Sequence, residues 1–124
     1  VVPNFVVQWG MHGDPEVMKK WIDATIADDP VVETNGRGTV TFAKTNSPNS
    51  RSVQLFVNLR DNPRLDGMGF APIGRVVEGM EAVEAINPEY GEAPNQGKIF
   101  ESGNEYLQKQ FPNLTYIQRA RVAD

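Results

Sequence analysis

The most unusual residues of the chain combine aromatic, aliphatic and amide side chains at or near expected strands: Phe5, Gln8, Ala43, Gln54, Phe56 and Leu65. Alternate side chains of a strand point to opposite faces, so residues 53–59 would present one aliphatic face and one face carrying Gln54, Phe56 and Asn58. This pattern predicts core packing on one face and a functional surface on the other. Composition alone favours a plainer interpretation, with the apolar members in the core and the glutamines at strand ends.

Residues suited to covalent or metal chemistry are scarce. His12 is the single histidine and no G-x-S-x-G motif accompanies it, so we interpret it as a turn residue. The pair Asp28-Asp29 lacks the D-x-D-x-D-G pattern of a calcium loop and is expected in a surface turn. Cysteine is absent, which excludes disulfides and zinc–thiolate sites. We therefore predict neither a metal nor a cofactor.

Length and composition suit one small domain. The chain has 124 residues, of which 40% are hydrophobic and 23% charged. Its formal net charge of −4 argues against a nucleic-acid partner, because phosphate binding requires a basic surface. There is no apolar run of ~18 residues and no signal-peptide pattern, so we expect a soluble protein without a membrane partner. Cytoplasm and periplasm both remain open as its compartment.

Runs of β-branched and aromatic residues between turn signals predict a mainly β protein. No alternation of strands with helices is visible, which favours an antiparallel sheet or barrel. The expected strands cover residues 5–8, 38–43, 53–59, 70–77 and 115–122.

Short helices are expected between these strands. Asp14-Pro15-Glu16 forms a helix-start signature for a helix that ends near Ile22, with Val17, Met18 and Trp21 on its packed side. Apolar periodicity predicts a second helix over residues 78–86. A capping-box pattern at Ser102 predicts the start of a third helix after a loop over residues 89–97.

Three ordered stretches resemble the cyclophilins, the peptidyl-prolyl cis–trans isomerases. Residues 1–8, V-V-P-N-F-V-V-Q, are similar to the family's R-V-[IV]-P-x-F-[MV]-[IV]-Q strand. Residues 38–56 resemble its G-x-[LV]-x-M-A-N-x-G-P-N-[TS]-x-x-S-Q-F-F segment. Residues 65–86 resemble L-D-G-x-x-x-x-F-G-x-V-x-x-G-M-x-V-V, with one additional residue before Ile73.

The resemblance implies a fold and a set of site residues. The family fold is an antiparallel β-barrel with a substrate groove on its outside. Relative to it, residues 1–124 would form a single cyclophilin-like domain that lacks the first two strands and the first helix. Phe5, Gln8, Phe56 and Leu65 would be the catalytic residues, and Val6, Ala43, Lys44, Gln54, Phe70 and Ile73 would bind substrate.

The implied reaction is rotation about an X-Pro bond in proline-containing peptides or unfolded protein segments. It must overcome a barrier of ~20 kcal/mol and needs no covalent intermediate. A cation beside the prolyl nitrogen stabilises the twisted state. In the family this cation is an arginine immediately before the position of Val1. It is absent from this chain, which we therefore expect to be weakly active or inactive.

Several departures from the family motifs lie in the groove. Arg64 stands where the family has a tryptophan, which puts strong cyclosporin binding in doubt. Lys44 replaces an asparagine and Ile73 a phenylalanine. These changes keep open a second hypothesis, a non-catalytic module that binds proline peptides. A hydrolase or metal enzyme, which would depend on His12, is the weakest hypothesis.

Overall fold

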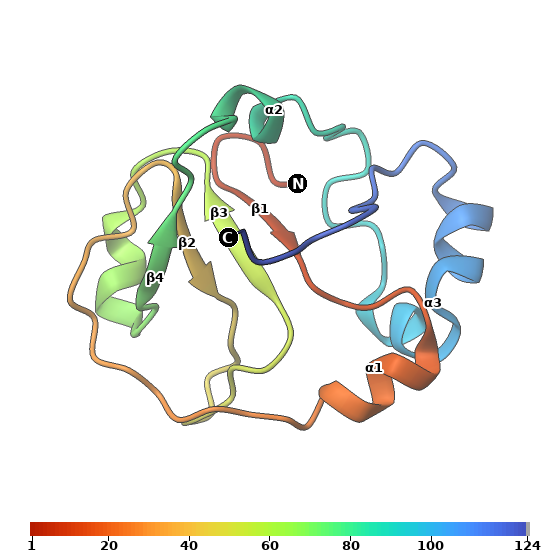
Figure 1. The fold of residues 1–124 in the computed structure, drawn as a ribbon, viewed down its shortest axis with the longest axis horizontal. Helices are drawn as coiled ribbons and strands as arrows, with labels where there is room; N and C mark the ends of the chain where they lie inside the picture. The colour runs from red at the N-terminus through yellow and green to blue at the C-terminus, as the bar shows by residue number, and fades with distance from the viewer. Residues whose placement is uncertain (124) are drawn as a thin grey trace.

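The computed structural model describes residues 1–123 and contains a four-stranded antiparallel sheet with the order β1-β3-β2-β4 (Figure 1). Its strands are β1 (Val6–Trp9), β2 (Thr39–Phe42), β3 (Leu55–Asn58) and β4 (Pro72–Arg75). Each lies inside or nearly inside a strand predicted from the sequence. This antiparallel sheet with short helices agrees with the predicted mainly β architecture.

The register between neighbouring strands separates two faces of the sheet. Gln8 pairs with Phe56 and Val7 pairs with Val57 across β1 and β3, while Thr41 pairs with Phe56 across β2 and β3. Directly paired residues point to the same face. Gln8, Phe56 and Thr41 therefore share one face, and the two valines lie on the other, as the alternation in residues 53–59 predicted.

The strand expected at residues 115–122 was wrong. This segment pairs with no strand, and Figure 1 shows it as an irregular stretch that returns beside β1. The side chains of Ile117 and Val122 are 60% and 94% exposed. β-branched residues favour strands because they pack well on a half-buried sheet surface. The side chains of this segment are too exposed to form such a surface.

The first two helices follow their sequence signals, with shorter bounds. α1 covers Pro15–Trp21, and the carboxylate of Asp14 caps it by accepting a hydrogen bond from the Glu16 amide. Met18 is buried, but Trp21 is 60% exposed, so its expected place on the packed side was wrong. α2 covers Met80–Glu84 and lies within the predicted residues 78–86.

The third helix begins earlier than predicted. α3 covers Gln96–Gln110, and the Asn95 side chain caps it by accepting from the Lys98 amide. Gly103 interrupts α3 with a non-helical φ of 56°, so a second helical segment begins beside the start predicted at Ser102. The break brings the Asn104 amide within 2.8 Å of the Gly13 carbonyl oxygen, and a side chain at Gly103 would overlap that oxygen.

One buried amide connects three parts of the fold. The Asn35 side chain is fully buried; its Oδ1 accepts hydrogen bonds from Thr41 Oγ1 at 2.8 Å and from Asn58 Nδ2 at 3.1 Å. Its Nδ2 donates to Asp66 Oδ1 at 2.7 Å and to the Phe70 carbonyl at 2.9 Å. Asn35 therefore links β2 and β3 to the 3-10 helix η1 (Pro63–Met68), in which Asp66 lies.

We predict that Asn35→Ala lowers the free energy of unfolding by about 2–4 kcal/mol, because it leaves several buried polar groups without partners. Urea unfolding followed by circular dichroism measures the change. Asn46→Ala, in an exposed loop, is the matched control and should change stability by less than about 0.5 kcal/mol. Equal unfolding midpoints for the two variants would contradict this role of Asn35.

Candidate functional site

An apolar cluster occupies the Phe56 face of the sheet. Val6, Phe56 and Leu65 are buried at its centre, with exposed fractions of 4–6%. The Phe56 and Phe70 rings meet edge to face with their centroids 5.8 Å apart. Partly buried side chains that pack around the centre are Val2, Phe5, Ala43 and Phe70. The cluster thus brings together six of the residues predicted for the site, from β1, β3, η1 and the segments beside them.

The turn of η1 places Leu65 and Phe70 next to each other. Gly69 ends η1 with a φ of 83°, a left-handed conformation that glycine adopts without a steric penalty. The reversed chain lets the Phe70 amide donate to the Leu65 carbonyl at 3.2 Å. Leu65 and Phe70 therefore reach the cluster as a pair.

Phe5 is held at the other side of the cluster through its backbone. Its carbonyl oxygen accepts from the Leu59 amide at 2.8 Å and from Asn62 Nδ2 at 3.1 Å. Asn62 Nδ2 also donates to Asn58 Oδ1 at 2.9 Å, so this anchor joins the buried polar network around Asn35. The backbone of Phe5 is thereby held beside the end of β3.

A row of three amides runs beside the cluster. Gln8 Nε2 donates to Gln54 Oε1 at 2.9 Å, and Gln54 Nε2 donates to Gln96 Oε1 at 3.2 Å. Each amide can both donate and accept, so the row can exchange these bonds for bonds to a peptide backbone. Gln8 and Gln54, both expected at the site, thus lie in contact. Gln96 was missed, because the sequence placed it in a loop rather than at the start of α3.

All three amides of the row line one open hollow of about 830 Å³. Of the apolar cluster, Val2, Phe5 and Val6 line it, whereas Phe56, Leu65 and Phe70 do not. Val1, Phe5 and Gln8 line one side of it, and Ile99 of α3 lies on the other. Residues 114–120 of the returning chain end line it as well. An extended peptide that occupied this hollow could reach both apolar and amide groups.

The remaining predicted site residues, Lys44 and Ile73, lie at the rim of the cluster or outside it. Lys44 places its Nζ 4.8 Å from the centroid of the Phe70 ring, at the rim of the cluster. Arg64, one of the departures from the family motifs, places its guanidinium carbon 5.2 Å from the centroid of the Phe5 ring. Ile73 lies on the edge strand β4 with 53% of its side chain exposed, and the cluster does not include it.

A second, smaller cavity of about 330 Å³ lies on the opposite face of β1 and β3. Val7 and Val57 contribute to it from the sheet, and Tyr116 and Ile117 from the returning chain end. Burial raises the pKa of the Tyr116 hydroxyl above its usual value. The two hollows adjoin at β1, because Gln8, Trp9 and residues 114–117 line both of them.

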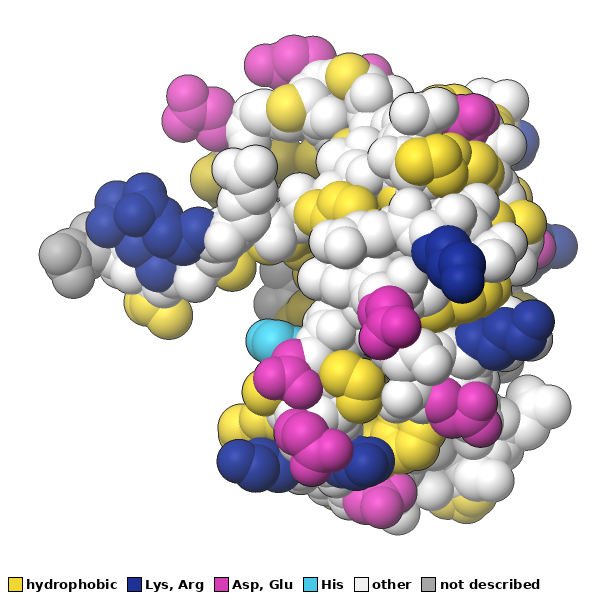
Figure 2. Space-filling view, turned by 90° about the vertical axis from the view of Figure 1, so that its right-hand side faces the viewer, with side chains coloured by type: hydrophobic (Ala, Val, Ile, Leu, Met, Phe, Trp, Pro, Cys, Tyr) yellow, Lys and Arg dark blue, Asp and Glu magenta, His cyan; other side chains and the backbone are white. Residues whose placement is uncertain are grey.

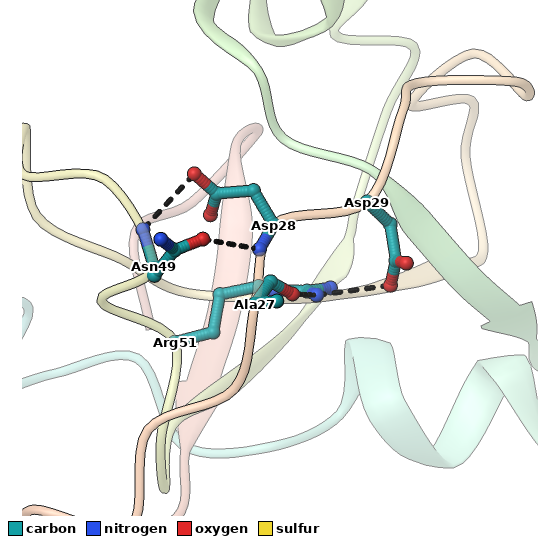
Figure 3. A network of polar contacts seen from close by, with 5 residues as sticks. All are labelled: Ala27, Asp28, Asp29, Asn49 and Arg51. Carbon is teal, nitrogen blue, oxygen red and sulfur yellow. Dashed lines mark hydrogen bonds and ion pairs between the residues drawn. The ribbon is translucent and has the colours of Figure 1, made fainter.

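Residues considered for metal or covalent chemistry have structural roles. Asp28 and Asn49 exchange hydrogen bonds between their side chains and main-chain amides, at 2.8 and 3.0 Å (Figure 3). The carboxylate of Asp29 lies 2.9 Å from the guanidinium of Arg51. Nδ1 of His12 accepts from the Asp14 amide at 3.0 Å. Among residues 1–123, no three His, Asp or Glu side chains are grouped so that they could hold a metal ion.

Figure 2 shows acidic and basic side chains mixed over the face that carries α1 and α3. Within residues 1–123, every helix is too short or too polar to cross a membrane.

The family assignment follows from comparison with known proteins. Residues 1–104 match the family model described as "Cyclophilin type peptidyl-prolyl cis-trans isomerase/CLD". The chain therefore belongs to the cyclophilin-type peptidyl-prolyl cis–trans isomerase family.

Curated relatives carry the same family name. A peptidyl-prolyl cis-trans isomerase of Acinetobacter baylyi is 37% identical over 94 residues, which are 69% of this chain and 48% of that protein. One of Streptomyces antibioticus is 36% identical over 96 residues, which are 69% of this chain and 56% of that protein. The chain thus spans about half the length of the curated relatives it matches.

A solved structure shares the fold. The crystal structure of a cyclophilin-type isomerase of Cryptosporidium parvum superposes with a TM-score of 0.53 at 21% identity, over 69% of this chain and 57% of that one. At this identity the likeness concerns the fold alone.

Hydrogen bonds hold the carboxylate of Asp66 in its ionised form. Thr34 Oγ1 donates to it at 2.6 Å, and the Asn35 side chain and amide donate at 2.7 and 2.8 Å. These bonds, with Thr34 contributing most, lower the pKa of Asp66 below its usual value. The ionised carboxylate therefore helps to hold η1, and with it Leu65, on the sheet.

This lowered pKa predicts an acid-dependent contribution to stability. Asp66 stabilises the fold above its unfolded pKa of about 3.8, and that stabilisation is lost as the pH falls through the lower, folded pKa. Asp66→Asn should be less stable than the wild type at pH 7, and this deficit should shrink by pH 3. Urea midpoints at both pH values, with the exposed Asp23→Asn as control, measure this. A deficit that is the same at both pH values would contradict the account.

Proposed function

We propose that the protein is a peptidyl-prolyl cis–trans isomerase whose apolar cluster is the proline pocket. The observation that carries the proposal is the arrangement of Val6, Phe56 and Leu65 beside the Gln8–Gln54 pair. An apolar surface that holds a five-membered ring, next to amides that bind the flanking backbone, is what this reaction needs. Family membership and the names of the relatives support the same function.

The reaction requires twisting rather than bond breaking. Rotation removes the resonance of the amide and passes a barrier of ~18–20 kcal/mol. A pocket that holds the ring while Gln8 and Gln54 hold the backbone can favour the twisted geometry over either planar one. Binding the transition state more tightly than the ground states lowers the barrier.

A cation at the prolyl nitrogen would complete this site. The family resemblance places an arginine immediately before Val1, and Val1 lines the same hollow as Phe5, Val6 and Gln8. Arg51 is an unsuitable substitute, because it is 4% exposed and its guanidinium contacts Asp29 and the Ala27 carbonyl. We propose that catalysis uses a cation at the position before Val1.

The substrates proposed are proline-containing peptides and unfolded protein segments. One structure of the Cryptosporidium parvum relative was determined in the presence of the dipeptide Ala-Pro. A second candidate function is binding of such segments without turnover. The rim cations Lys44 and Arg64, which stand at positions where the family motifs have other residues, favour this candidate.

Exchange NMR separates the two functions. A proline tetrapeptide is titrated into the chain, and the exchange rate between its cis and trans signals is measured. The chain with an arginine added before Val1 is measured in parallel. Binding with faster exchange in either chain supports the isomerase, and binding without faster exchange in both supports the binding module. A peptide that binds neither chain would contradict both functions.

We predict that Phe56→Ala weakens binding of the tetrapeptide by about tenfold or more, because it removes the largest apolar surface at the centre of the pocket. Val57→Ala is the matched control, since Val57 is equally buried at 4% but lies on the opposite face. Both variants should lose stability, and amide NMR spectra establish that each is folded. Equal affinities for the two variants would place the binding site elsewhere.

A further inference from the structure

We propose that Lys44 and Arg64 make the proline pocket selective for segments with an acidic residue within two positions of the proline. This inference rests on the proposed function, because it assumes that the apolar cluster binds proline. It adds the chemical class of the preferred substrate. The inference rests on two observations. Both cations lie at the rim of the pocket, and neither has a carboxylate partner among residues 1–123.

Each cation lies on an aromatic ring of the pocket. Lys44 Nζ is 4.8 Å from the centroid of Phe70, whose ring packs edge to face on Phe56. The Arg64 guanidinium carbon is 5.2 Å from the centroid of Phe5. Both rings pack against the buried cluster. The two positive charges are therefore fixed at the rim by different elements, the segment after β2 and η1.

Neither cation is neutralised within the described part of the chain. Among residues 1–123, no carboxylate oxygen lies within 4.0 Å of the Lys44 amine or the Arg64 guanidinium. The carboxylates nearest in sequence to Arg64 are engaged elsewhere. Asp61 accepts from the Arg37 amide at 2.8 Å, and Asp66 accepts from Thr34 and Asn35. An acidic side chain of a bound peptide would thus meet free positive charges.

The geometry sets how far from the proline the acidic residue can stand. A peptide in an extended conformation advances about 3.3 Å per residue. With the proline ring against Phe56, a carboxylate one or two residues away would lie over the Phe5 or Phe70 ring. The chain as a whole has a net charge of −4 and repels an acidic peptide at long range, so the preference must come from these local cations.

The test compares dissociation constants for neutral and acidic proline peptides. The probes are a tetrapeptide with alanine around the proline and a set in which glutamate replaces each alanine in turn, all with blocked ends. At low ionic strength we expect at least one glutamate peptide to bind about two- to fivefold more tightly than the alanine peptide. Raising the salt concentration should reduce this ratio, because exposed charges are screened.

Charge-removing variants assign the preference to the two residues. In Lys44→Gln/Arg64→Gln the ratio between the alanine and glutamate affinities should fall to about one. Lys20→Gln, an exposed lysine at the end of α1, is the matched control and should keep the wild-type ratio. Amide NMR spectra establish that the variants are folded. Because each ratio compares two peptides on the same variant, a change that weakens both peptides equally leaves the ratio unchanged.

The outcomes separate this inference from the function on which it rests. Equal binding of alanine and glutamate peptides by the wild type would overturn the acidic preference and leave the proline pocket intact. A preference that survives in the double variant would overturn the assignment to Lys44 and Arg64. If none of the proline peptides binds, the proposed function fails, and the inference fails with it.

Discussion

The buried side-chain amide of Asn35 is the interaction on which the rest of the site depends. It accepts from β2 and β3 and donates to Asp66 and to the Phe70 carbonyl, so it joins the sheet to η1. The apolar contacts of the pocket are few, and Leu65 reaches Phe56 because this polar network brings η1 against the sheet. A fully satisfied buried network specifies one geometry, whereas apolar contacts alone tolerate several.

The two faces of β3 differ, which allows a sheet of four strands to carry a functional surface on one face. Phe56 and Val57 are neighbours in the chain and equally buried, yet Phe56 packs in the apolar cluster and Val57 lines the smaller cavity on the other face. The Phe56 face carries amides and the rim cations beside its apolar centre, whereas the cavity on the Val57 face is bordered mainly by apolar side chains.

Local patterns in the sequence predicted much of this arrangement. Alternation in residues 53–59 separated Phe56 from Val57, and Asp14-Pro15 identified the start of α1. The motif resemblance predicts that Phe5, Gln8 and Leu65 belong to one site. Long-range partners could not be predicted in this way. The Asn35-Gly36 pair indicates a turn, and nothing local shows that its amide binds residues 31–35 positions away. Gly103 likewise breaks α3 because of its contact with Gly13.

The central claim is that a proline ring occupies the Phe56 face of the sheet. Intermolecular nuclear Overhauser effects between a bound proline peptide and the methyl groups of the protein test it most directly. We expect contacts from the proline ring protons to the methyl groups of Val6 and Leu65. Contacts to the methyl groups of Val7 and Val57 instead would place the ring in the cavity on the opposite face and contradict the account.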